Sequence, residues 1–496
     1  IYAPLAGGAP SAWRAAITAA IAWSLRASGR KPDAVAVTAA SVIVFGIADP
    51  ETLVKPGFLL SIAATAAILA PIEGAFDKPL RAIVVASVRA SVATAPVVLW
   101  CFEGVPIAGV LANVVVVPIA SAVLLPIAAV HALLASTLPS LAGPSAALID
   151  LISRAFLASC EAFAAIPIGR GLPPLDIAQG VAVACTCTAL LLVRGVREKA
   201  IVLAIGALAI GAAELRLRHV EQPRGEVRAT FLDVGQGDGA LIDMPDGRLV
   251  LVDAGGVVGG GLDPGAVAIV PLLRARRRAR IDLAVITHPH PDHYGGLRAL
   301  LEHVEVGEIW DTGQAEDESP DGEFAEMLRS ARARGVVVRT PADLCGSPRA
   351  FGEATLRVLW PCPVFDAGWD PNDNSFVIEL AIGARRMLLS GDAEHHEESV
   401  LAASGLLGHV DVLKVAHHGS RTSSTPPFLE ALTPRVAIVS AGRANRFGHP
   451  HPDVVERLAA TAQHVVRTDR EGGAIVTTDG RRMHVQTWRG RVIDVE

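Results

Sequence analysis

The amino-terminal part of the chain is a succession of apolar blocks, and this feature limits the possible folds more than any other. Eight blocks rich in Ala, Val, Leu and Ile cover residues 11–25, 34–48, 57–70, 82–102, 105–136, 147–166, 177–193 and 199–213. A membrane-spanning helix needs roughly 20 apolar residues. A large helical core surrounded by water is the alternative, but so many blocks favour an α-helical polytopic membrane domain over residues 1–213.

Basic residues between the blocks give an orientation for this domain. The basic segments 26–31 and 194–199 mark two loops as cytoplasmic. If one helix follows the second loop, residues beyond 213 emerge on the opposite, outer face of the membrane. Four arginines after that helix argue against this orientation: Arg216, Arg218, Arg224 and Arg228.

A cluster of potential metal ligands follows an apolar strand in the second half of the chain. Residues 281–286 form a β-branched run typical of a buried strand, and the turn that follows contains His288, His290, Asp292 and His293. Imidazole and carboxylate groups suit zinc or manganese. No cysteine lies near enough to suggest a closed structural zinc site, so the turn predicts an open metal site suited to hydrolysis. A histidine-rich surface turn is the alternative.

Further polar clusters lie at the ends of later strands. Asn374 precedes one apolar strand, Asp392 follows another, and His417 and His418 follow a third. His449 lies in a loop before a helix. Strand, polar loop and helix alternate, and sites are often assembled in this way at one edge of a sheet. A carboxylate such as Asp392 can bridge two metal ions, although each residue alone could be an ordinary strand-end polar group.

Charge and cysteine content say less about function. The net charge of −6 gives no general case for a nucleic-acid partner, although a local basic patch is compatible with it. The basic run 274–280 predicts the solvated end of a helix, with a phosphate-contacting face as the alternative. The six cysteines form no CxxC pair, so we expect small buried hydrophobic residues rather than a disulfide framework.

These motifs resemble known families. The HxHxDH turn, Asp253-Ala-Gly, Ser390-Gly-Asp392 and a late histidine resemble the metallo-β-lactamase superfamily. Within it, Asp233-Val-Gly-Gln-Gly-Asp238 and His417-His418-Gly419-Ser420 resemble the carboxy-terminal domain of the ComEC family, the DNA-uptake channels of natural competence.

The apolar half agrees with this resemblance, since residues 49–61 and 112–118 resemble the competence domain of the ComEC family. The resemblance implies a polytopic membrane competence domain (1–213), a linker (214–225) and an αβ/βα four-layer metallo-β-lactamase-like domain (226–496) in the inner, cytoplasmic membrane. With the orientation given by the basic loops, the metal domain is expected on the outer, periplasmic or extracellular face. It also implies that the family's amino-terminal oligonucleotide-binding-type domain and the first part of its membrane domain lie outside this chain.

The resemblance implies roles for individual residues around two divalent ions, zinc or manganese. The implied metal ligands are His288, His290, Asp292, His293, Asp392, His417 and His418. The residues implied to act in catalysis are Asp292, Asp392 and His449. The residues implied to bind or shape the approach of the substrate are Asp233, Gln236, Asp238, Asn374, Ser375 and Ser420.

One departure from the superfamily affects the first metal site. A further histidine commonly lies between the HxHxDH turn and Asp392, but here that interval contains only His303, which comes too early. Asn374 is the residue expected near the vacant position. Whether His417 or His418 completes the second site stays open.

The resemblance implies transport of transforming DNA across the inner membrane, with a metal-dependent nuclease hydrolysing the strand that is not transported. The expected partners are single-stranded DNA in the channel, duplex DNA at the metal domain, membrane lipid, and competence DNA-receptor and translocation proteins. A homo-oligomer is compatible with this role. The alternatives are a membrane-tethered metallo-hydrolase of another ester and a channel whose metal domain only binds DNA.

Overall fold

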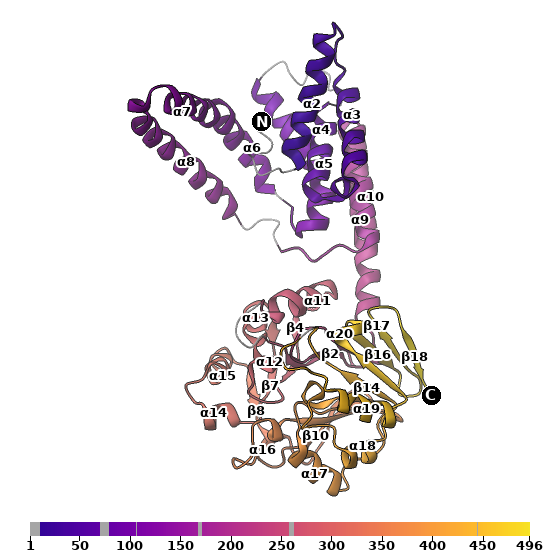
Figure 1. Cartoon of the computed structure of the whole chain (residues 1–496). Helices are drawn as coiled ribbons and strands as arrows, with labels where there is room; N and C mark the ends of the chain where they lie inside the picture. The colour runs from indigo at the N-terminus through magenta and orange to yellow at the C-terminus, as the bar shows by residue number, and fades with distance from the viewer. Residues whose placement is uncertain (1–9, 70–78, 106, 167–170, 257–261, 444) are drawn as a thin grey trace. The chain divides into compact units, whose positions relative to one another are not determined.

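A computed structural model describes residues 10–69, 79–105, 107–166, 171–256, 262–443 and 445–496 (Figure 1). The chain divides into two compact units, Ile1–Leu217 and Arg218–Glu496. The boundary falls inside the linker predicted at 214–225. The residues there are helical up to Glu221, however, because helix α10 (Val196–Glu221) runs through the boundary.

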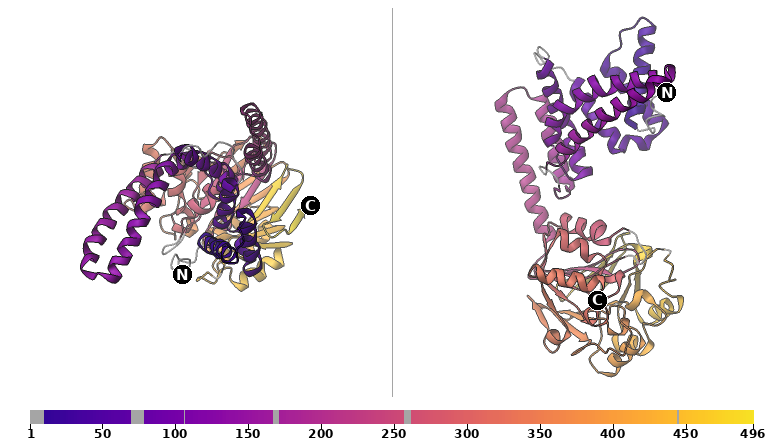
Figure 2. Two further views of the ribbon diagram at one scale, coloured as in Figure 1. Left: turned by 90° about the horizontal axis from the view of Figure 1, so that it is seen from above. Right: turned by 90° about the vertical axis from the view of Figure 1, so that its left-hand side faces the viewer.

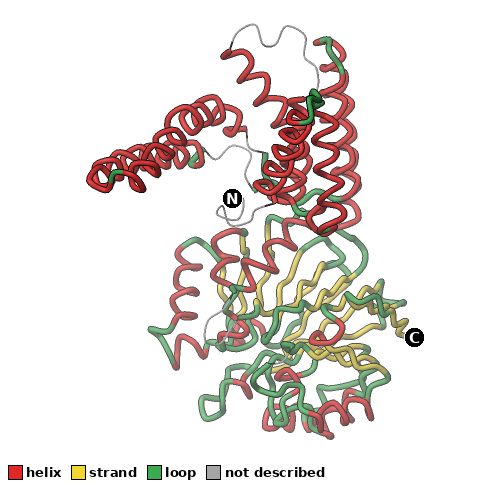
Figure 3. Tube along the Cα trace, turned by 45° about the horizontal axis from the view of Figure 1, so that its top comes forward, coloured by secondary structure: helices red, strands yellow, loops and turns green. Residues whose placement is uncertain are grey.

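The described part of the first unit consists of helices and loops, without strands (Figure 3). Its α-helices are α2 (Pro10–Ala27), α3 (Ala34–Ala48), α4 (Pro56–Leu69), α5 (Pro79–Phe102), α6 (Ile107–Ile119), α7 (Leu125–Thr137), α8 (Ala142–Ala164), α9 (Ile177–Leu192) and α10. Four of the described stretches are long and apolar enough to cross a membrane: Arg81–Phe102, Leu111–Thr137, Pro139–Ala164 and Val196–Glu221. The helical fold predicted for this part of the chain is therefore confirmed.

The predicted block 105–136 is not one regular helix. Pro118 lies near the end of α6, and the π-helical turn η2 (Ala120–Leu124) follows before α7 begins. A proline inside a helix removes one backbone hydrogen bond, which explains the irregular turn. α7 and α8 then run side by side as a hairpin (Figure 2).

The second unit contains two large sheets. The nine-stranded sheet has the order β18-β17-β16-β1-β2-β3-β5-β7-β8, and the seven-stranded sheet has the order β15-β14-β13-β12-β11-β10-β9. The strands of the first sheet are β1 (Val227–Phe231), β2 (Gly239–Asp243), β3 (Leu249–Ala254), β5 (Leu283–Val285), β7 (Glu308–Trp310), β8 (Val337–Arg339), β16 (Ala474–Thr478), β17 (Met483–Thr487) and β18 (Val492–Val495). Those of the second are β9 (Arg349–Phe351), β10 (Ala354–Trp360), β11 (Val377–Ile382), β12 (Arg385–Leu389), β13 (Val412–Lys414), β14 (Val436–Val439) and β15 (His464–Arg467). A separate pair joins β4 (Arg280–Ile281) to β6 (Glu305–Val306).

Ten α-helices accompany the sheets in the described part of this unit. They are α11 (Val270–Ala275), α12 (Pro291–Tyr294), α13 (Leu297–His303), α14 (Gln314–Glu318), α15 (Glu323–Ala333), α16 (Pro341–Leu344), α17 (His395–Ala403), α18 (Pro426–Leu432), α19 (Pro452–Thr461) and α20 (Thr468–Glu471).

Three hydrophobic clusters show that the helices and sheets form four layers. Every residue of β3 is buried, and alternate residues of a strand point to opposite sides. Both faces of β3 are therefore covered. Val250 and Val252 belong to the core between the two sheets, whereas Leu249 and Leu251 pack with residues of α11, α13 and α15. A third cluster packs the outer face of the second sheet against α17, α18 and α19. The predicted αβ/βα four-layer fold is therefore confirmed.

Parallel strands bring the polar strand ends together. β3, β5, β7 and β8 pair in parallel within the first sheet, and β12, β13, β14 and β15 do so within the second. The carboxyl ends of parallel strands lie at the same edge of a sheet. The polar residues after β3, β5, β12 and β13 therefore lie where a site can form.

The basic run 274–280 is not a solvated helix end throughout, which corrects the prediction for two of its residues. The side chains of Arg276 and Arg278 are 6% and 10% exposed, and both donate to the fully buried carboxylate of Asp243. Arg228 on β1 donates to the same carboxylate and also to the carbonyl of Glu221, at the end of α10. These three arginines bind a buried carboxylate and so stabilise the domain. They do not form an open phosphate-binding face.

One disulfide was not expected from the sequence. Cys345 and Cys362 are bonded, with a Cα–Cα distance of 5.7 Å. Seventeen positions separate them, a spacing that predicts neither a metal motif nor a bond. The bond joins the end of α16 to the segment after β10, so the expectation of six free thiols was wrong for this pair.

We predict that Asp243→Asn will lower the free energy of unfolding by about 3–5 kcal/mol, because three guanidinium groups lose their buried charged partner. Chemical unfolding of the chain in detergent, followed by tryptophan fluorescence, measures the difference. Asp246→Asn is the matched control, since Asp246 pairs with the partly exposed Arg248 and its loss should cost about 1 kcal/mol or less. Equal losses in the two variants would contradict the role assigned to Asp243.

Candidate metal centre

The HxHxDH turn places its side chains at the end of β5. His288 is fully buried, and its Nε2 lies 2.9 Å from Nδ1 of His290. α12 begins at Pro291, where fixed backbone φ favours a helix start, and its first turn presents Asp292 and His293. His293 is fully buried, and its ring lies 4.1 Å from that of His288.

Asp253, at the end of β3, orients His293. Its Oδ1 accepts a hydrogen bond from the Thr287 amide at 2.8 Å, and its Oδ2 accepts from the Thr287 hydroxyl and from His293 Nδ1, each at 2.9 Å. The proton of His293 is thereby fixed on Nδ1, leaving Nε2 free to bind a metal. Asp253 was noted in the sequence only as part of a motif. The sequence feature that could have indicated its role is a carboxylate at the end of a predicted strand, shortly before two glycines.

Asp392 lies at the middle of the cluster. Its Oδ2 is 3.3 Å from His293 Nε2, 3.6 Å from His418 Nε2, 3.7 Å from His417 Nε2 and 4.0 Å from His288 Nε2. The preceding residue, Gly391, has φ +47, and a Cβ there would lie 2.8 Å from Ser375 Cβ. A glycine is therefore required for the turn that delivers Asp392.

The two adjacent histidines lie in different surroundings. Both have left-handed φ values, 46° for His417 and 53° for His418, which directs their rings apart. His418 is buried, with Nε2 3.4 Å from Asp292 Oδ2 and Nδ1 bonded to the Ser440 carbonyl. His417 is partly exposed, and its Nδ1 lies 2.8 Å from Glu394 Oε1. Sequence reasoning could not separate these two positions.

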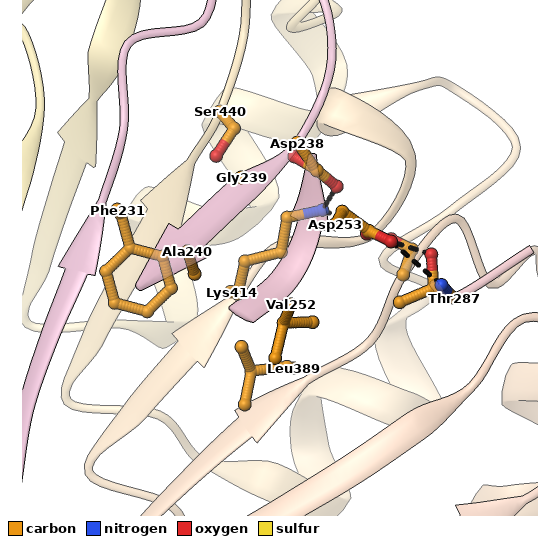
Figure 4. Close-up of a pocket in the computed structure, with 11 residues that line it drawn as sticks. Phe231, Asp238, Gly239, Ala240, Val252, Asp253, Thr287, Leu389, Lys414 and Ser440 are labelled. Atoms are coloured by element: carbon orange, nitrogen blue, oxygen red, sulfur yellow. Dashed lines mark hydrogen bonds and ion pairs between the residues drawn. The ribbon is translucent and has the colours of Figure 1, made fainter. Parts of the chain in front are cut away.

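Asp238 and Lys414 form a buried ion pair at the inner side of the cluster. Figure 4 shows the Lys414 ammonium group directed at Asp238, beside Asp253 and Thr287. The ammonium group also donates to the Gly391 carbonyl at 3.2 Å. Burial raises the pKa of Asp238, but the charges of Lys414 and His418 outweigh it and lower that pKa to about 2. Lys414 was missed because it reads as an ordinary strand residue.

The other sequence-predicted residues surround this centre in different ways. Asp392 N donates to Ser375 Oγ at 3.1 Å, which places Ser375 directly behind Asp392. The Asn374 amide bonds to the backbone of Asp366 and Asp370 and so holds a loop. Gln236 Oε1 accepts from the Gly442 amide at 3.3 Å.

Of the remaining predicted residues, Asp233 and His449 lie nearer the surface, whereas Ser420 is buried. Asp233 is exposed, and the hydroxyl of Ser420 contacts Thr422 Oγ1 at 2.9 Å. His449 lies outside the cluster, its ring 5.7 Å from that of His417. Burial, followed by the charges of His417 and His418, lowers the pKa of His449 to about 4, so its imidazole is neutral at neutral pH.

Several atoms of the centre have no hydrogen-bond partner among the described residues although they are buried. They are His293 Nε2, Asp392 Oδ1, His418 Nε2 and Asp238 Oδ1. Unpaired buried polar atoms are rare in proteins unless a ligand or water satisfies them. Asp238, His293, Asp392 and His418 each offer a ligand atom within 4.8 Å of the others. The residues therefore fit a divalent cation held by nitrogen and oxygen ligands.

The metal-free histidines hold protons that a metal must displace. Burial lowers the pKa of His293 and His418, but in His293 the charges of Asp392 and Asp253 outweigh it and raise the pKa well above its usual value. In His418 the charges of Asp392 and Asp238 raise the pKa to about 10. Below these pKa values a metal competes with the protons for both rings.

We therefore predict that metal affinity rises with pH between 6 and 8, by about 10-fold per pH unit for each proton displaced. Calorimetric titration of the chain with Zn²⁺ in buffers of different ionisation enthalpy counts the protons released. About two protons per chain are expected at pH 7. His484→Ala is the control, because His484 lies on β17 outside the centre. Proton-independent binding would contradict the geometry described.

Comparison with known proteins agrees with both units. Residues 1–197 match the family model described as "Competence protein", and residues 232–443 match that of the metallo-beta-lactamase superfamily. The chain is 28% identical to "ComE operon protein 3" of Bacillus subtilis over 496 residues, covering 95% of this chain and 62% of that protein. It is 30% identical to "Competence protein ComA" of Neisseria gonorrhoeae over 485 residues, with the same two coverages.

A third relative matches over a shorter length. "Recombination protein 2" of Haemophilus influenzae is 31% identical over 288 residues, which is 56% of this chain and 33% of that protein. The chain thus spans less than two thirds of the length of these relatives. The chain joins a domain of the competence protein family, in residues 1–197, to a domain of the metallo-β-lactamase superfamily, in residues 232–443.

Proposed function

We propose that this protein takes part in the uptake of transforming DNA across the inner membrane and that its metal domain hydrolyses phosphodiester bonds of the strand that is not transported. The observation that carries the proposal is the combination, in one chain, of a competence-family helical domain and a buried His/Asp centre in a metallo-β-lactamase fold. DNA, membrane lipid and competence DNA-receptor and translocation proteins are the proposed partners.

Paired divalent cations, zinc or manganese, would activate water and neutralise the charge that develops on the phosphate. The chain supplies the geometry for this chemistry. Asp292, His293 and His418 would hold one ion, and Asp392 lies between the imidazoles of both sites. His288 and His290 would hold the other ion. His417, whose Nε2 faces Asp392 at 3.7 Å, would take the place of the additional histidine of the superfamily.

His449 is the proposed substrate contact beside the metals. Its backbone amide donates to Asn445 Oδ1 at 3.0 Å, and its carbonyl accepts from Asn445 Nδ2, so the loop is fixed. A neutral imidazole can donate a hydrogen bond to a phosphate oxygen through one nitrogen and accept a proton through the other. Its position next to His417 allows both roles at the scissile bond.

An aromatic ring next to His449 favours a nucleic acid over a small ester as substrate. Phe447 is 48% exposed, and its ring lies 5.9 Å from the His449 ring at an angle of 9°. The Arg446 guanidinium lies 5.0 Å from the Phe447 ring centre. Exposed aromatic rings with neighbouring arginines bind unpaired nucleobases by stacking and sequence-independent contacts.

The disulfide supports a location of the metal domain on the outer face of the membrane. Bonds such as Cys345–Cys362 persist in oxidising compartments and are rare in the cytosol. The four apolar helical stretches of the first unit support a multi-pass membrane protein. The proposed metal domain would therefore meet incoming DNA before the membrane domain does.

We predict that the chain in detergent cleaves labelled duplex DNA in the presence of Mn²⁺ or Zn²⁺. Asp392→Asn and His293→Ala should reduce the rate at least about 100-fold, since changes behind a metal ligand already cost 10–100-fold. Asp317→Asn, an exposed carboxylate in α14, is the control and should retain the rate.

Three outcomes would contradict the proposal in different ways. Cleavage that persists in Asp392→Asn would point to a contaminating nuclease. Hydrolysis of a small carboxylic ester, but not of DNA, would indicate a membrane-tethered metallo-hydrolase of another ester. Salt-sensitive DNA binding without hydrolysis would indicate a channel domain that only binds DNA.

We also predict that Phe447→Ala raises KM for a single-stranded oligonucleotide about 5- to 150-fold, because one base-stacking contact contributes 1–3 kcal/mol. Phe447→Tyr should restore binding. An oligonucleotide with an abasic position at the cleavage site should not distinguish Phe447→Ala from the wild type. Trp488→Ala removes another exposed aromatic ring and is the matched control. An equal effect of both alanine variants would exclude stacking on Phe447.

A further inference from the structure

A second group of possible metal ligands lies beside the metal centre and shares no residue with its buried ligand group. Asp373, Glu394 and His395 each offer a ligand atom, and these atoms lie within 4.8 Å of one another. Asp373 belongs to the short helical turn η5 (Asn372–Asn374), while Glu394 and His395 lie at the start of α17. The turn before β11 and the turn after β12 thus contribute to one cluster.

An unpartnered amide oxygen independently indicates a ligand at this cluster. Asn372 is 9% exposed, and its Nδ2 donates to Glu394 Oε1 at 3.2 Å, so its side chain lies against one of the three residues. Its Oδ1 is buried and has no hydrogen-bond partner among the described residues. A buried amide oxygen without a donor is unusual, because its desolvation is not compensated.

A buried carboxyl group next to the cluster also lacks a partner among the described residues. Glu397 is fully buried, and neither of its carboxyl oxygens has a hydrogen-bond partner within the described part of the chain. Its backbone amide donates to Asp373 Oδ1 at 3.2 Å, which places it next to the cluster. Asp373 accepts a second bond from the Glu394 amide and faces His396 Nδ1 at 3.3 Å. A divalent cation would offset the charges of the Asp373 and Glu394 carboxylates.

We propose that Asp373, Glu394 and His395, with Asn372 Oδ1, form an additional divalent-cation site separate from the hydrolytic centre. Three of the four donors are oxygen atoms, which suit Mn²⁺, and an imidazole is compatible with the same ion. Mn²⁺ is therefore the probe to use. The partial exposure of Glu394 and His395 leaves room for water to complete the coordination.

The cation site would fix the orientation of His417, a residue of the metal centre. Glu394 Oε1 lies 2.8 Å from His417 Nδ1, and His417 Nε2 faces Asp392. A carboxylate that contacts the second nitrogen of a ligand histidine fixes the orientation and the tautomer of the ring. A cation bound to Glu394 would hold this carboxylate, and hence His417, in place.

The test is the Mn²⁺ content of the full chain in detergent after equilibrium dialysis, measured by mass spectrometry. We expect His395→Ala and Asp373→Asn each to bind one ion fewer than the wild type. His395 is exposed, so its replacement should leave the fold intact. His484→Ala, at an exposed histidine on β17, is the control and should bind as many ions as the wild type.

A variant of the hydrolytic centre separates this proposal from the proposed nuclease function. His293→Ala should lose ions from the centre but keep one ion, and the double variant with His395→Ala should lose that ion too. Unchanged Mn²⁺ content in both His395→Ala and Asp373→Asn would overturn the additional site. That result would leave the hydrolytic centre and the nuclease proposal unaffected, because neither requires this ion.

Discussion

The buried ion pair between Asp238 and Lys414 joins the two sheets beneath the metal centre. Asp238 directly precedes β2 of the nine-stranded sheet, and Lys414 ends β13 of the seven-stranded sheet. An isolated buried charge costs several kcal/mol, so each group requires the other. The Lys414 ammonium also binds the carbonyl of Gly391, next to Asp392. The pair therefore fixes the spacing of the two sheet edges that supply the ligands.

Much of the centre could be predicted from the sequence because its ligands lie in short local motifs. His288, His290, Asp292 and His293 lie within six consecutive positions after a recognisable strand, and Asp392 follows another. The four-layer fold could be expected only from the family resemblance that those motifs carry. The different surroundings of His417 and His418 could not be predicted, because they depend on two left-handed backbone conformations that residue types do not reveal.

Residues whose roles depend on distant partners could not be predicted. Lys414 reads as part of an apolar strand, and its partner Asp238 lies 176 positions earlier. Arg276 and Arg278 form part of a basic run that resembles a solvated helix end, until Asp243 is placed beside them by strand pairing. The disulfide between Cys345 and Cys362 likewise depends on the fold, because it requires the segment after β10 to return to the end of α16.

The arginines that bind Asp243 lie next to the residues that end α10. The carbonyl of Glu221, the last residue of α10, is bonded to Arg228, and the next residue, Gln222, donates to the Arg277 carbonyl. Arg228 lies on β1, and the turn after β1 carries Asp238. One strand and one turn thus separate the end of a long apolar helix from the buried carboxylate that supports the metal centre.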